Sequence, residues 1–273
     1  MVLLARQVML KRFAFVLALC VIVTGVVFIA LDILDIAEDF RLYISIPVLD
    51  TVFICLVAII VVYLSTRNYA TSGSWEMLGI GCAVLAFGFA SLLHSWMKIE
   101  PDYNARITAN DTGILIAGIC HLGGGILATR RWATMLHDIG ARRNILIISY
   151  LAIFLVISLV AWMAFHNIIT FYIRSLTDYL AGRDVIQGIA ALLCMAAAII
   201  YLRMYLKSNS VFYLWYVLGL VLFTAGYLFI SRGFLESRIA WLGRTSEYIA
   251  GFYFLASVLY YRRQARTGGE VTK

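Results

Sequence analysis

The chain has 273 residues, of which 63% are hydrophobic and only 14% are charged, and its mean hydropathy is +0.92. A soluble domain carries about 25% charged residues, so this composition excludes a soluble globular protein and predicts an integral membrane protein. The net charge of +7 arises from basic residues between apolar runs. That placement is typical of the positive-inside rule for membrane proteins, and we expect no nucleic-acid partner.

The apolar runs predict an all-α, polytopic transmembrane bundle. They are long and contain few prolines, whereas a transmembrane barrel would show segments of about ten residues with alternating hydropathy. A helix needs about 20 apolar residues to span the membrane. We predict eight spans, with seven as the fallback, because only a few polar residues separate the sixth and seventh runs and because Arg244 and Glu247 interrupt the eighth. In chain order these are residues 13–33, 44–65, 75–97, 111–129, 144–166, 184–205, 211–230 and 239–261.

The distribution of charge predicts the orientation of the bundle. Most of the 22 Lys and Arg residues fall on one side if both termini are cytoplasmic, and most of the 15 acids fall toward the other. The loops are short, so neighbouring helices are expected to be antiparallel. With no repeat and no linker, we expect one transmembrane domain over residues 1–273, with no soluble output domain in the chain.

Ionisable side chains inside the predicted spans are the candidates for function, because they are costly in lipid. At 1.5 Å per residue, Asp50 lies about 9 Å and His94 about 5 Å below the outer edge of their spans. The other candidates also fall in the predicted outer half of the membrane. We therefore predict one outward-facing polar pocket for a small molecule or an ion, lined by Asp50, His94, Asp111, His121, Arg244 and Glu247.

The candidates have different expected surroundings. Asp111, with Asn110, is expected to cap the fourth helix at the outer surface after a polar loop, because both are preferred N-cap residues. The apolar neighbours of Asp50 favour a partly buried carboxylate over an exposed one. Arg244 and Glu247 are three residues apart on one helix and are able to pair. They form either an internal ion pair or part of the pocket, with Arg244 offered to an anionic or polar ligand.

His94 and His121 raise the alternative of a haem or metal ion, with both as ligands. Two axial imidazoles must lie at nearly the same depth, and the predicted depths differ by about 10 Å. Gly113, Ala117 and Gly125 form a row of small residues with His121, which suits either a cofactor or close helix packing. We predict no cofactor. The five cysteines all lie in apolar segments and are interpreted as small buried hydrophobic residues. No enzyme motif is present, so we expect no enzyme.

Three stretches match a family pattern in order and spacing. The third span contains Gly79-Ile80-Gly81, Gly88 and Ser91-Leu92-Leu93-His94, followed by Asn104 and Thr108. Residues 242–261 and 48–68 supply a matching last helix and a matching second helix, with an acid at Asp50. Together they resemble the third family of membrane-associated sensor (MASE) domains, an N-terminal sensory module of bacterial and archaeal histidine kinases and diguanylate cyclases.

The sequence also departs from this family. The family's Asp before Leu-Leu-His is Ser91, its His and Lys in the last helix are Arg244 and Glu247, and its Trp early in the fourth helix is missing. The resemblance thus implies the fold and a sensory role, with a different ligand. It also implies a prokaryotic cytoplasmic (inner) membrane, and a signal that leaves through the last helix to a cytoplasmic partner or fused output domain. A homodimer is possible.

Two further functions stay open at this level. The first is a haem-binding electron-transfer subunit that uses His94 and His121. The second is a membrane anchor or scaffold subunit of a larger complex, whose partners would be membrane lipid and other proteins.

Overall fold

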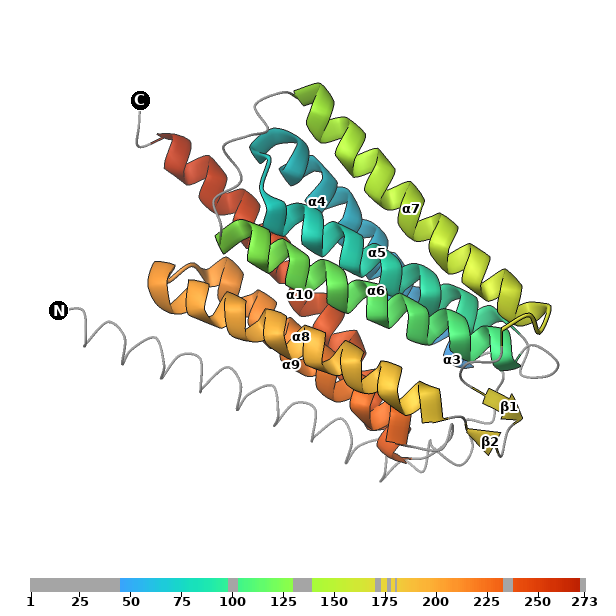
Figure 1. Cartoon of the computed structure of the whole chain (residues 1–273). Coiled ribbons are helices and arrows are strands. Elements are labelled where there is room, and N and C mark those ends of the chain that lie inside the picture. Colours follow the sequence, from blue (N-terminus) through green and yellow to red (C-terminus); the bar gives the residue numbers. More distant parts are fainter. Residues whose placement is uncertain are drawn as a thin grey trace. The chain divides into compact units, whose positions relative to one another are not determined.

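The computed structural model describes residues 45–97, 103–129, 139–169, 173–175, 178–179, 181–232 and 238–270 (Figure 1). The predicted span 13–33 lies outside these residues. The first described span is continuous and consists of α3 (Ser45–Asp50), the π-helix η1 (Thr51–Leu56) and α4 (Val57–Ser72). It is followed by α5 (Trp75–Trp96), α6 (Tyr103–Thr129), α7 (Ile139–Phe165), α8 (Ala181–Ser208), α9 (Val211–Arg232) and α10 (Arg238–Glu270). A short antiparallel pair, β1 (Ile173–Ser175) and β2 (Asp178–Tyr179), lies between α7 and α8.

The helical membrane architecture is confirmed. Within the described residues, six helices are long and apolar enough to cross a membrane. They are Ile46–Ser72, Trp75–Trp96, Asn104–Thr129, Ile139–Phe165, Val185–Ser208 and Val211–Ile230. The predicted number of eight is not confirmed, because α10 covers the eighth run but falls outside this set. The cytoplasmic location of both termini stays a prediction.

The chain divides into two compact units at α8. One contains Ile44–Ala197, and the other contains Met1–Tyr43 with Ala198–Lys273. We call their described parts the α3–α8 unit and the α8–α10 unit, because α8 contributes residues to both. That the whole chain is a single domain stays a prediction.

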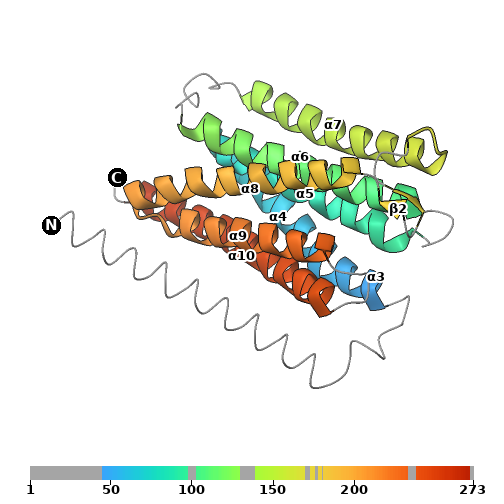
Figure 2. The same ribbon diagram turned by 60° about the horizontal axis from the view of Figure 1, so that its bottom comes forward.

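The α3–α8 unit is built around the antiparallel pair α5 and α6, with α7 along its edge (Figures 1 and 2). A Cβ on Gly79 would lie 2.8 Å from the Cα of Gly124 and 2.9 Å from the carbonyl oxygen of Cys120. Near the other end, a Cβ on Gly113 would overlap the Cβ of Ala90. The backbones therefore touch near both ends, and Gly113 serves close helix packing.

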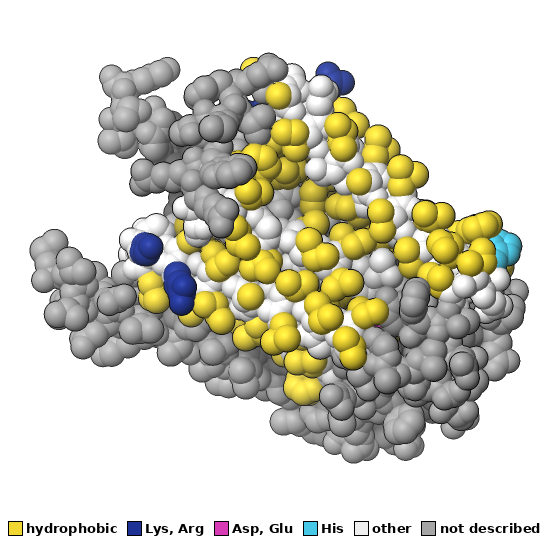
Figure 3. Space-filling view, in the orientation of Figure 1, with side chains coloured by type: hydrophobic (Ala, Val, Ile, Leu, Met, Phe, Trp, Pro, Cys, Tyr) yellow, Lys and Arg dark blue, Asp and Glu magenta, His cyan; other side chains and the backbone are white. Residues whose placement is uncertain are grey.

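The outer face of α7 carries large apolar side chains that suit lipid. Ile148, Leu155 and Leu159 are 65%, 68% and 57% exposed. Hydrophobic side chains dominate the surface view, in which Lys and Arg appear only toward the ends of the helices (Figure 3). Apolar side chains exposed over a whole helix face are stable in hydrocarbon and would be costly in water.

The α8–α10 unit is held by close helix contact and by aromatic rings. Gly226 of α9 faces α10, since a Cβ there would lie 2.7 Å from the carbonyl oxygen of Gly243. The ring of Tyr216 on α9 lies 4.4 Å from that of Tyr201 on α8 and 5.6 Å from that of Phe254 on α10. Ring pairs at these distances add to the hydrophobic stabilisation of a core.

We predict that Gly113→Ala lowers the free energy of unfolding by about 1–3 kcal/mol, because the new methyl group forces α5 and α6 apart. The measurement is thermal unfolding of the detergent-solubilised protein, followed by helical circular dichroism. Gly123→Ala is the matched control, since nothing lies within 4 Å of a Cβ at that position of the same helix. Equal effects of the two substitutions would contradict the packing argument.

Candidate functional site

Asp50 lies at an irregular point of the first described span. It is the last residue of α3, directly before η1, and is 1% exposed. Its carboxylate accepts a 2.5 Å hydrogen bond from the hydroxyl of Ser95 on α5. π-helical segments inside α-helices are rare and are frequent at functional sites. A buried carboxylate at such a segment is therefore the strongest single candidate in the chain.

Thr51 connects the start of η1 to both neighbouring helices. Its hydroxyl donates to the carbonyl oxygen of Pro47 at 2.7 Å and accepts from the indole nitrogen of Trp96 at 2.9 Å. Pro47 is tolerated because it lies in the first turn of α3, where its missing N–H is not needed. These contacts hold the end of α5 against the α3–η1 junction, and they place Ser95 beside Asp50.

His94 lies at the same end of α5 and faces α6. Its Nδ1 is 3.3 Å from the carbonyl oxygen of Arg106, and the two residues are 9% and 5% exposed. This contact places the end of α5 level with the start of α6. His94 is therefore positioned by the backbone of α6, and Arg106 is a buried cation that the sequence interpretation overlooked.

Asp111 lies inside α6 and does not cap it, so that prediction is wrong. The helix begins at Tyr103, and Asp111 follows eight residues later, about two turns further along. It is 1% exposed, and both carboxylate oxygens lie 3.5 Å from the side-chain nitrogen of Gln187 on α8. Residues 103–110 are polar enough to resemble a loop. They are nevertheless helical, and Asn104 and Thr108 make side-chain hydrogen bonds within the protein.

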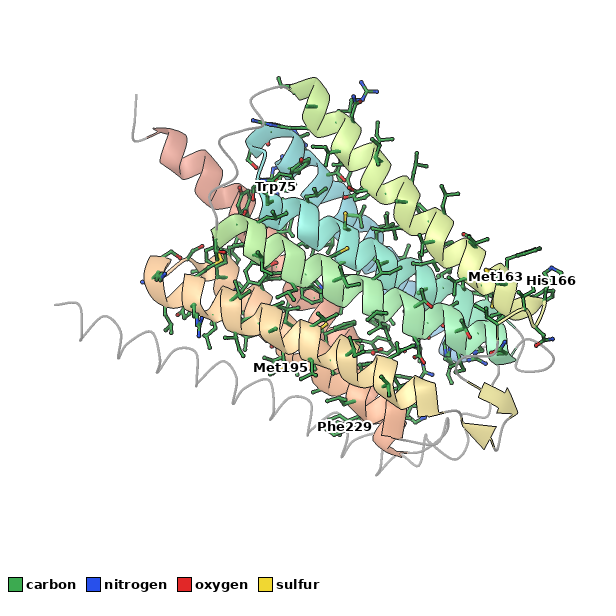
Figure 4. The ribbon with its side chains drawn as sticks, viewed as in Figure 1. Trp75, Met163, His166, Met195 and Phe229 are labelled. Carbon is green, nitrogen blue, oxygen red and sulfur yellow. The ribbon has the colours of Figure 1, made fainter. Side chains whose placement is uncertain are left out.

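The polar side chains of Asn104 and Thr108, in the first turns of α6, are hydrogen-bonded within the protein. The Asn104 amide donates to the carbonyl oxygens of Ala164 at 3.0 Å and Ile169 at 2.8 Å. The Thr108 hydroxyl donates to the Asn104 side-chain oxygen at 3.3 Å. Asn104 thus satisfies carbonyl groups at the end of α7, near Met163 and His166 in Figure 4. These two residues of the family-like pattern join α6 to α7.

His121 lies far from His94 along the bundle. It is fifteen residues beyond Arg106 on α6, or about 22 Å along the helix axis. That separation exceeds the predicted difference of about 10 Å, because α6 starts eight residues earlier than expected. One iron cannot take both imidazoles as axial ligands across this distance. His121 is 1% exposed, and it lies further along the bundle axis than Asp50, His94 and Asp111.

No group of three or more His, Cys, Asp and Glu side chains that could hold a metal ion occurs in the part of the chain that the structure describes. The six predicted site residues therefore have to be judged by their polar contacts.

Arg244 and Glu247 belong to the other unit, on α10. Each is 6% exposed. Glu247 packs against α9, since a Cβ on Gly226 would lie 2.9 Å from its Cγ. Glu247 therefore lies beside a small residue of the neighbouring helix. That these two residues share a pocket with the other four stays a prediction.

The α3–α8 unit thus contains three buried polar contacts between helices: Asp50 with Ser95, His94 with the carbonyl oxygen of Arg106, and Asp111 with Gln187. We call the residues of these contacts the buried polar cluster: Asp50, His94, Ser95, Arg106, Asp111 and Gln187, all at most 9% exposed. Sequence reasoning found three of its members. It missed Ser95 and Gln187 because only ionisable residues were weighed, and Arg106 because its segment resembled a loop. Gln187 could have been found from the sequence, because it is a polar uncharged residue inside a predicted span.

No family model, no curated protein and no solved structure matches this chain. The resemblance to the third MASE family therefore rests on its motif residues alone and stays a prediction. What the polar cluster does has to be argued from its own chemistry.

We predict that Asp50 and Ser95 are energetically coupled by about 1.5–3 kcal/mol, the range for a hydrogen bond to a charged group. The measurement is a double-mutant cycle of unfolding free energies with Asp50→Asn and Ser95→Ala in detergent. Ser72→Ala is the control partner, since its hydroxyl donates to the carbonyl oxygen of Asn68 and accepts from the backbone N–H of Ser74, both near the end of α4. That pair should be additive within about 0.5 kcal/mol. Additivity of the Asp50–Ser95 pair would refute the contact.

Proposed function

We propose that this chain is an integral-membrane sensory domain that binds a small polar molecule or an ion at the buried polar cluster. The observation that carries the proposal is Asp50, a buried carboxylate at the start of a π-helical segment in a membrane-spanning helix. We further propose a prokaryotic cytoplasmic membrane, entry of the ligand from the outer side, and a cytoplasmic signalling partner or output domain. The role is binding, without catalysis.

The cost of the cluster supports a functional role. A charged side chain in a membrane helix costs about 2.5–3.5 kcal/mol on insertion scales, and apolar residues of similar volume pack a core as well or better. The α5–α6 interface shows that this chain builds purely structural contacts from Gly and Ala. Two buried carboxylates that contact side chains of other helices, Ser95 and Gln187, are therefore better explained by binding than by stability.

Burial limits the ligand's size. Asp50 and Asp111 are each 1% exposed, and His94, the most exposed member of the cluster, is only 9% exposed. A large ligand would have to separate the helices, whereas an ion or a molecule of a few atoms needs only local rearrangement. The Asp111–Gln187 contact is at the upper limit of hydrogen-bond length and is the contact that such a ligand would exchange most easily.

Helix α8 offers a route for the signal. It carries Gln187 in one unit, and in the other it carries Tyr201, whose ring packs on Tyr216 of α9. The same Tyr216 ring packs on Phe254 of α10. A ligand that changes the position of Gln187 would act on this aromatic group through the helix itself. It shifts the equilibrium only if it binds one arrangement more tightly than the other.

The two alternatives are less well supported. A haem between His94 and His121 conflicts with their separation along the bundle. An anchor or scaffold subunit would need apolar faces such as that of α7, but contact with lipid explains this face equally well. Such a role also gives no reason for the buried carboxylates.

We predict that at least one small probe raises the unfolding temperature of the purified full chain, and that Asp50→Asn and Asp111→Asn abolish the shift. The probes are Na⁺, K⁺, ammonium, choline, glycine and acetate, and the readout is thermal unfolding in detergent. A probe at 100 times its dissociation constant stabilises the folded state by about 2.7 kcal/mol. Glu76→Gln is the control, because this acid accepts from Ser74 at the opposite end of α5. A shift that survives in both Asp variants, or no shift with any probe, contradicts the proposal.

A further inference from the structure

Two cysteines face each other across the α5–α6 interface. Gly79 lies against Cys120 and Gly124, and Gly113 lies against Ala86 and Ala90. This antiparallel register places residue 82 of α5 opposite residue 120 of α6. The thiols of Cys82 and Cys120 are within hydrogen-bonding reach of each other.

Facing thiols are unusual in this interface. The close backbone contacts at Gly79 and Gly113 depend on Gly and Ala, the residues that allow helices to approach in membranes. Cys55 and Cys194 are differently placed, since the Cys55 thiol donates to the carbonyl oxygen of Gly88 at 3.5 Å and the Cys194 sulfur lies against Gly118. All four of these cysteines are free thiols.

Neutral hydroxyl groups lie near Cys82. Ser149 of α7 is within hydrogen-bonding reach of the Cys82 thiol. The neighbouring Tyr150 hydroxyl is 2.9 Å from that of Thr66 on α4. Cys82 is 5% exposed, whereas Cys120 is only partly buried. An oxidant dissolved in the membrane would therefore reach the pair at Cys120.

We propose that Cys82 and Cys120 form an oxidisable dithiol, whose product is a disulfide joining α5 to α6 and whose oxidant is a membrane-soluble quinone. The two S–H bonds break and one S–S bond forms. The thiols lose two electrons and two protons, and the quinone takes up both and leaves as a hydroquinone. The register is favourable, because facing positions of touching helices bring Cα atoms into the range that disulfides span.

The disulfide would fix the sliding position of α5 against α6. α5 carries His94 and Ser95, and α6 carries Arg106 and Asp111, so oxidation would lock four of the six members of the buried polar cluster in one register. The dithiol itself does not depend on the proposed ligand, and its chemistry is tested separately.

The test uses the full chain in detergent, treated in parallel with duroquinone, which is fully substituted and so does not alkylate thiols, and with copper phenanthroline in air. Remaining thiols are alkylated after denaturation and assigned by peptide mass spectrometry. We expect alkylated cysteines to fall from the five of the sequence to three with both oxidants, with a linked Cys82–Cys120 peptide and a raised unfolding temperature.

Cys82→Ser and Cys120→Ala serve as matched variants, and each should keep all four of its remaining thiols. Retention of alkylated Cys55 and Cys194 in the wild type shows that the protein stays folded during oxidation. A disulfide with copper phenanthroline alone would overturn the quinone as oxidant. No Cys82–Cys120 link with either reagent, or the same loss of thiols in the two variants, would overturn the dithiol itself.

Discussion

The α3–α8 unit depends on the close backbone contact between α5 and α6. Gly79 and Gly113 have no side chains near the two ends of this interface, so the two helices touch there and meet in one register. That register places His94 against the carbonyl oxygen of Arg106. It also fixes the level of Ser95, and hence of Asp50, relative to α6. The positions of the polar groups therefore follow from residues that carry no polar groups themselves.

Hydropathy predicted where the membrane helices lie, because a run of apolar residues is itself the requirement for spanning a membrane. It failed at the start of α6, where Tyr103 to Asn110 look like a loop. Hydropathy measures a side chain's cost in lipid, but Arg106 and Thr108 are buried in protein. The error carried over to Asp111, taken for a cap, and to His121, whose depth was underestimated because α6 was expected to begin too late.

The polar partners needed tertiary information. Ser95 is 45 residues from Asp50 and Gln187 is 76 residues from Asp111, so no local spacing connects either pair. The π-helical segment after Asp50 has no sequence signature that periodicity detects. Cysteine and tyrosine count as apolar on a composition scale, which is why Cys82, Cys120 and Tyr150 resembled ordinary core. Their arrangement depends on the α5–α6 register and on how α7 packs beside it.

Asp50 and Ser95 join an irregular helix to one that is held in place by its neighbour. Ser95 belongs to α5, which the glycine contacts with α6 hold in place, whereas Asp50 belongs to a helix whose hydrogen-bond pattern changes at the next residue. If that segment changed between π and α geometry, the face that Asp50 presents to α5 would change with it. A group that competed with the Ser95 hydroxyl for Asp50 would favour one geometry over the other. Binding at this carboxylate would then be converted into movement of α3 and η1, while α5 and α6 keep their register.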